Sequence, residues 1–129
     1  MMISGIYAGL CGVLLLALSA QVVGLRRRFQ VGIGSGGQEE LQRAIRVQAN
    51  FIEYTPITLI LLMLAELQGA WQWLLHVAGF LLVVGRALHA TGLRQSSGRT
   101  FGRFYGTLST WLALVLLIAM NLAAVVWAG

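Results

Sequence analysis

Four runs of apolar residues, each long enough to cross a membrane as a helix, constrain this chain more than any other feature. They cover residues 3–25, 47–67, 73–93 and 105–127, and about 20 apolar residues are enough for a helix to span the hydrocarbon core of a bilayer. With 58% hydrophobic and only 10% charged residues, the composition excludes a soluble enzyme, a disordered chain and a disulfide-stapled secreted module. We therefore predict an all-α integral membrane protein whose single domain is a four-helix bundle with up-down topology.

The positions of the basic residues predict how the bundle is oriented. All nine are Arg, and all but Arg86 lie in the first and third connections between the apolar runs. Because cytoplasmic loops carry an excess of Arg and Lys, both of these connections are expected in the cytoplasm and both termini on the other side of the membrane. The same positions make membrane topology, and not nucleic-acid binding, the explanation for the net charge of +5.

The second apolar run opens with polar side chains that membrane helices rarely carry. At 100° per residue, Arg46, Asn50 and Glu53 lie on one helical face, and Tyr54 lies beside them. Glu53 is about two helical turns from Arg46, at a depth where a carboxylate must be paired, protonated or bound to a ligand. Pairing with Arg46, or with Arg86 of the next run, would make it a structural lock. The alternative is a polar pocket for a charged ligand.

The third apolar run ends with Arg86 and His89, which share a helical face. If the second and third helices pack antiparallel, this pair lies opposite the Asn50–Glu53 face. The alternative for Arg86 is that its side chain extends to the membrane surface. No metal site is expected, because His76 and His89 fall near opposite surfaces and the single Cys lies elsewhere. A cluster of Arg, Asn, Glu, His and Tyr suits an anionic ligand with carboxylate and amide groups.

One stretch has the form of a family signature, and it reads Arg46-x-Gln48-x-Asn50-x-x-Glu53-Tyr54-x-Pro56. It resembles the second-helix signature of the MAPEG family, the membrane-associated proteins in eicosanoid and glutathione metabolism. The resemblance extends over nearly the whole chain and is strongest with the short bacterial inner-membrane members. It implies a homotrimer in the inner membrane, where the orientation predicted from the arginines places both termini in the periplasm. It also implies that glutathione binds between neighbouring subunits near the cytoplasmic face.

The resemblance also implies a role for individual residues. The positions that contact glutathione in the family correspond here to Arg26, Arg46, Gln48, Asn50, Glu53, Tyr54, Arg86 and His89. The catalytic arginine that opens the fourth helix corresponds to Arg103 or, in a second register, to Arg99. Many active members carry Tyr one turn beyond the position of His89, where this chain has Leu93.

Three functions follow from these observations. The first is a transferase or peroxidase that uses glutathione as a thiol co-substrate and acts on lipophilic electrophiles or hydroperoxides arriving through the bilayer. The second is a catalytically silent glutathione- or lipid-binding scaffold of the same fold, which Leu93 favours. The third is a small transporter subunit, since buried charges also mark ion pathways. A transporter would carry charges throughout the bilayer depth, whereas the charges here gather near one surface.

Reporter fusions test the predicted orientation. We expect a periplasmic reporter such as alkaline phosphatase to be active when it is fused after Gly129, because the positive-inside rule keeps the Arg-bearing connections in the cytoplasm. The same reporter inserted after Gly34, in the first connection, should be inactive. Enzymatic activity of the two fusions in intact cells is the measurement, and a cytoplasmic C-terminus would contradict the prediction.

Overall fold

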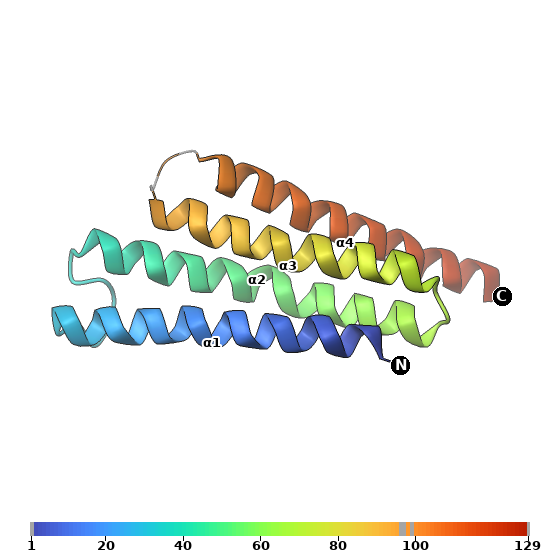
Figure 1. The fold of residues 1–129 in the computed structure, drawn as a ribbon, viewed down its shortest axis with the longest axis horizontal. Coiled ribbons are helices and arrows are strands. Elements are labelled where there is room, and N and C mark those ends of the chain that lie inside the picture. The colour runs from blue at the N-terminus through green and yellow to red at the C-terminus, as the bar shows by residue number, and fades with distance from the viewer. Residues whose placement is uncertain (1, 96–97, 99, 129) are drawn as a thin grey trace.

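The computed structural model describes residues 2–95, 98 and 100–128, and over these residues it consists of four helices joined by loops. The helices are α1 (Ile3–Phe29), α2 (Glu39–Leu67), α3 (Gln72–Gln95) and α4 (Phe101–Ala128). They run alternately in opposite directions along one axis, and both ends of the chain lie at the same end of the bundle (Figure 1). All four are long and apolar enough to cross a membrane. The predicted all-α, up-down membrane bundle is therefore confirmed.

The helices extend beyond the apolar runs that predicted them. α1 continues past residue 25 through three arginines to Phe29 and ends at Gln30, whose φ of 55° is left-handed. α2 begins at Glu39, well before the predicted span. Its first turn carries two glutamates, whose negative charges interact favourably with the positive end of the helix dipole. α4 begins at Phe101, before the predicted start at residue 105. Apolar content predicts the segment inside the hydrocarbon core, whereas charged helix ends lie outside it.

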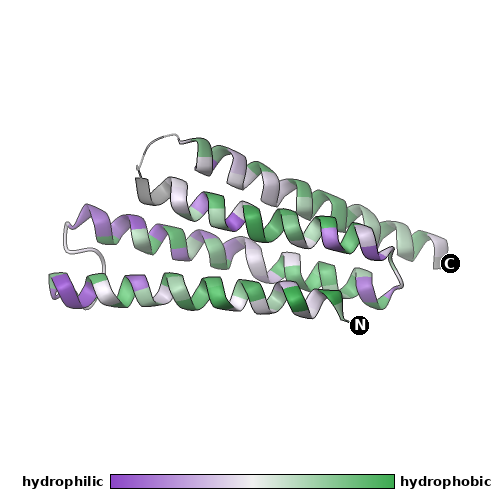
Figure 2. Ribbon diagram, viewed as in Figure 1, coloured by the Kyte–Doolittle hydropathy of each residue, from purple (hydrophilic) through white to green (hydrophobic). Residues whose placement is uncertain are grey.

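The two middle helices form the centre of the bundle. α2 and α3 each pack against the other three helices, whereas α1 and α4 make no contact with one another over the residues described. The outer faces of α1 and α4 are consequently rich in exposed apolar side chains, such as Leu16 and Val126, and α4 is apolar along most of its length (Figure 2). Lipid or a further subunit is expected to cover such faces.

Polar residues gather at the two ends of the bundle (Figure 2). The larger group lies toward the α1–α2 connection. At the opposite end, Glu66 of α2 accepts hydrogen bonds from the backbone N–H groups of Ile3 and Ser4 and from Ser4 Oγ, at 2.9 Å and 2.5 Å for the two Ser4 contacts. Glu66 therefore caps the first turn of α1 from a neighbouring helix, a role that the sequence did not predict.

α3 and α4 approach each other so closely that their backbones touch. A Cβ atom added to Gly92 would lie 2.5 Å from the backbone nitrogen of Arg103, and one added to Gly106 would lie 2.5 Å from the backbone nitrogen of His89. Small residues at such crossings allow membrane helices to pack closely. The two glycines thereby set the height of His89 relative to Arg103.

We expect Gly92→Ala to destabilise the bundle by about 1–3 kcal/mol, because the added methyl group must push the two backbones apart. Gly12→Ala is the matched control, since a Cβ atom at Gly12 meets nothing within 4 Å. Thermal unfolding in detergent, followed by circular dichroism, measures both. An unchanged midpoint for Gly92→Ala would show that α3 and α4 are not held in this close contact.

Candidate functional site

Arg86 is a charged side chain buried at the centre of the polar group, with only 2% of its surface exposed. Its Nε donates a hydrogen bond to Thr110 Oγ1 at 2.9 Å, and its Nη1 donates one to Asn50 Oδ1. The guanidinium carbon lies 5.3 Å from the centroid of the Tyr54 ring, within the range of a cation–π contact. Arg86 thus joins α2, α3 and α4, and the alternative in which its side chain extends to the membrane surface is wrong.

The guanidinium of Arg86 still has an unused donor. Its Nη2 is buried and has no hydrogen-bond partner among the described residues. No carboxylate in this part of the chain forms an ion pair with it, since the ion pairs present there join other residues. A buried cation without a counter-charge is costly. The buried charge favours an anion nearby, but Arg86 is not among the residues that line the neighbouring cavity.

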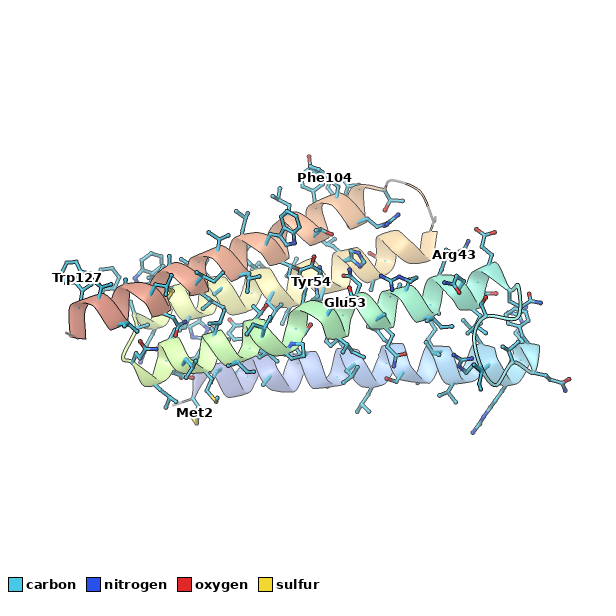
Figure 3. The ribbon with its side chains drawn as sticks, turned by 180° about the vertical axis from the view of Figure 1, so that it is seen from behind. Met2, Arg43, Glu53, Tyr54, Phe104 and Trp127 are labelled. Atoms are coloured by element: carbon cyan, nitrogen blue, oxygen red, sulfur yellow. The ribbon has the colours of Figure 1, made fainter. Side chains whose placement is uncertain are left out.

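Glu53 pairs with Arg46 and not with Arg86. The distance between Arg46 Nη2 and Glu53 Oε1 is 3.7 Å, and both side chains are 53% exposed. Glu53 and Tyr54 lie side by side on α2, near the middle of the bundle (Figure 3). An exposed ion pair of this length contributes at most about 1 kcal/mol to stability. Both charged groups therefore remain accessible to a ligand.

A cavity of about 440 Å³ lies between α2, α3 and α4 at this end of the bundle. Its polar wall consists of Asn50, His89 and Arg103, one residue from each helix. Its remaining wall belongs to α4 and is formed by Phe104, Thr107, Leu108 and Trp111. Phe104, Leu108 and Trp111 are exposed, and Phe104 points outward from α4 (Figure 3). The volume is typical of small-molecule sites, and the opening faces the apolar surface of the bundle.

Arg103 lies in the first turn of α4, at the mouth of this cavity. Its Nη1 donates a hydrogen bond to the carbonyl oxygen of Gly98 at 2.6 Å, which ties the guanidinium to the α3–α4 connection. Of the two residues that the sequence offered for the catalytic arginine, Arg103 lines the cavity. Arg99 lies outside the described residues.

Of the eight predicted ligand-binding residues, Asn50 and His89 line the cavity. Arg26 and Gln48 make their contacts on the α1 side of the bundle. Nη1 of Arg26 donates to the carbonyl oxygens of Gly34 at 2.9 Å and Val31 at 3.4 Å, and so closes the α1–α2 connection. Nε2 of Gln48 donates to Ser19 Oγ of α1 at 2.8 Å. Within one subunit, Arg26 therefore stabilises the α1–α2 connection, and Gln48 joins α2 to α1.

The sequence did not predict the two threonines that α4 contributes. Thr107 lines the cavity and Thr110 binds Arg86. Together with Arg103 they recur at the i, i+4, i+7 spacing of one helical face. The threonines were missed because the predicted fourth span began at residue 105, so the face that they share with Arg103 was not considered.

Comparison with known proteins decides the family. The model of the MAPEG family matches residues 4–123, which is most of the chain. The chain belongs to the MAPEG family. It is 40% identical over 126 residues to the inner membrane protein YecN of Escherichia coli K12, which covers 98% of this chain and 95% of that protein. YecN of Escherichia coli O6:H1, strain CFT073, matches to the same extent. The resemblance seen in the α2 signature, and its bacterial inner-membrane character, are thus confirmed.

The candidate residues of this MAPEG chain form two neighbouring groups. One is the exposed Arg46–Glu53 pair on α2, and the other surrounds the cavity and the buried Arg86. Asn50 connects them, since it lies between Arg46 and Glu53 on the helical face, accepts a hydrogen bond from Arg86 and lines the cavity. A ligand that contacts Asn50 is therefore within reach of both groups.

Proposed function

We propose that this MAPEG chain is a glutathione-dependent transferase or peroxidase of the bacterial inner membrane that acts on lipophilic electrophiles or hydroperoxides. The observation that carries the proposal is the buried guanidinium of Arg86, whose Nη2 lacks an acceptor and which has no carboxylate partner among the described residues. Glutathione carries two carboxylates and two amide groups, so it supplies both the negative charge and the oxygen acceptors that Arg86 lacks.

The exposed pair on α2 suits the other end of the same ligand. Arg46 and Glu53 are held only by a long contact of 3.7 Å. A ligand group with a carboxylate and an amine can replace that contact with two shorter ones, because Arg binds carboxylates and Glu binds amines. We place glutathione between the subunits of a homotrimer. Arg26 and Gln48 then complete the site from the α1 side, where they lie away from the cavity.

The chemistry proposed for the cavity is thiolate formation and attack. A free thiol has a pKa of about 8.5, and an adjacent cation lowers the pKa of such a group by about 1–3 units. Arg103 lines the cavity from α4 and provides that cation. The thiolate then meets an apolar substrate that enters from the lipid side, past Phe104 and Trp111.

A catalytically silent glutathione- or lipid-binding scaffold is the second candidate. The observation that favours it is Leu93, at a position where many active members carry Tyr. A transporter subunit is a weaker third. It requires charges throughout the membrane, whereas the arginines gather toward the α1–α2 connection, where α2 is most polar (Figure 2).

We expect Glu53→Gln to weaken glutathione binding by about 1–3 kcal/mol, because it removes the charged acceptor for the ligand's amine. Glu40→Gln is the matched control, since Glu40 lies on the same helix in an exposed ion pair with Arg28 at 3.6 Å. Calorimetric titration of the detergent-solubilised protein measures both. If Glu53→Gln binds glutathione normally while the assembly dissociates, Glu53 is a structural lock instead.

We expect Arg103→Ala to leave glutathione affinity within a few-fold while the thiolate absorbance at neutral pH disappears and turnover falls by about 100-fold or more. The physical reason is that a cation next to the sulfur stabilises only the anionic form of the ligand. Ultraviolet absorbance of the complex and conjugation kinetics are the measurements.

Arg99→Ala is the control for the register of this arginine and should cause a much smaller loss. A larger loss for Arg99→Ala would move the catalytic role to Arg99. If neither variant differs from an active wild type, arginine-assisted thiolate formation is not the mechanism. A wild type that binds glutathione without forming a thiolate would favour the silent scaffold.

A further inference from the structure

The side chain of His89 is buried beside the cavity and forms no hydrogen bond with the described residues of the subunit. It is 6% exposed and lines the cavity together with Asn50 and Arg103. Neither ring nitrogen has a hydrogen-bond partner within the part of the chain that is described. The other histidine differs, because Nδ1 of His76 lies 2.9 Å from the hydroxyl of Tyr7. A buried, unpartnered imidazole at a cavity wall indicates that its partner is a ligand.

The contact between α3 and α4 fixes where this imidazole lies. The backbone of His89 is pressed against Gly106, where a Cβ atom would come within 2.5 Å of the His89 nitrogen. Arg103 precedes Gly106 by about one helical turn, on the wall of the same cavity. The imidazole and the guanidinium therefore belong to one site, held together by backbone packing and not by flexible loops.

Thiolate formation requires a group that takes the proton of the thiol. Arg103 cannot take it, because a guanidinium stays protonated in proteins. Asn50 and Thr107, which also line the cavity, do not titrate near neutral pH. The phenol that many family members carry one turn further along the third helix is absent, since this chain has Leu93 there. Among the residues lining the cavity, His89 is the side chain with a neutral ring nitrogen that can accept a proton.

We propose that His89 is a catalytic base that accepts the proton of the bound thiol, an assignment that rests on the proposed function. A free ring nitrogen takes the proton from the S–H bond, and the bonding electron pair stays on sulfur. The charges of Arg46, Arg86 and Arg103, on α2, α3 and α4, act on the imidazole and oppose a lasting imidazolium, so the proton has to pass on to the product or to water. These three cations stabilise the anionic sulfur that the proton transfer leaves behind.

The same proton completes either reaction. In conjugation by addition, the sulfur forms a bond to the electrophilic carbon, and the displaced electron pair on the product takes the proton from His89. In conjugation by substitution, a halide such as the chloride of chlorodinitrobenzene leaves as the anion, and His89 passes the proton to water. In peroxide reduction, the sulfur attacks one oxygen of the hydroperoxide and the O–O bond breaks. The departing alkoxide takes the proton from His89, giving an alcohol and a glutathione sulfenic acid. A second glutathione then condenses with the sulfenic acid to give the disulfide and water.

The experiment compares the full chain with His89→Gln in detergent, over a range of pH. Glutathione is the thiol, with chlorodinitrobenzene or cumene hydroperoxide as the second substrate. His89→Gln should lower kcat/KM at neutral pH by about 100-fold or more. The deficit should shrink as the pH rises past the pKa of the free thiol, about 8.5, because the thiol then ionises without a base. His76→Gln, the matched control at the other end of the bundle, should keep the wild-type pH profile.

A second variant guards against a folding defect in the first. His89→Ala leaves space for free imidazole, and added imidazole should restore part of its turnover while wild type stays unaffected. Failure of this rescue, or a loss in His89→Gln that is equal at all pH values, would overturn the assignment. A loss in His89→Gln that lies wholly in glutathione binding, with kcat unchanged at saturating glutathione, would also overturn it, because His89 would then only hold the ligand.

Failure of the proposed function is distinguished by the wild type alone. If the wild type binds glutathione and turns over neither substrate, the transferase and peroxidase functions fail. The thiolate absorbance of the complex then decides on His89 separately. An absorbance present in wild type and absent in His89→Gln supports the proton transfer, and equal absorbance in both overturns it.

Discussion

The burial of one guanidinium within the bundle is the constraint on which the site depends. A cation at this depth must find acceptors, and Arg86 finds them on both neighbouring helices, at Asn50 of α2 and Thr110 of α4. These bonds fix the three helices relative to one another where their polar residues gather. They also leave Nη2 unsatisfied. The interaction that holds the polar end of the bundle together thus also leaves a positive charge there without a carboxylate partner among the described residues, and the proposed function rests on that charge.

The contact between α3 and α4 determines the rest of the geometry. Because Gly92 and Gly106 let the two backbones touch, Arg103 at the start of α4 comes to line the same cavity as His89. The polar wall therefore rests on regular helices, which hold side chains more accurately than loops do. Only the guanidinium of Arg103 depends on a connection, through its bond to the carbonyl oxygen of Gly98.

The sequence predicted most of the fold and half of the site. Apolar run length and helical periodicity were enough for the four spans and for the α2 face with Arg46, Asn50 and Glu53. The partners of Arg86 were not predictable, because they depend on the distance between α3 and α4, which glycines far apart in the sequence decide. The choice of Arg46 as the partner of Glu53 was one of two open alternatives, and side-chain conformation decided it. The cap that Glu66 provides for α1 joins residues at opposite ends of two helices, so no local pattern indicates it.

The cavity has one polar wall and one wall whose apolar side chains, Phe104, Leu108 and Trp111, form part of the outer surface of α4. A reactant that arrives across this wall never has to leave the hydrocarbon phase, so its effective concentration is its mole fraction among the lipids and not its molarity in the surrounding water. Oily molecules that are scarce in the aqueous phase accumulate in the bilayer, in proportion to their partition coefficient. In the proposed function, selection among them begins with partitioning, before any side chain of the protein is met.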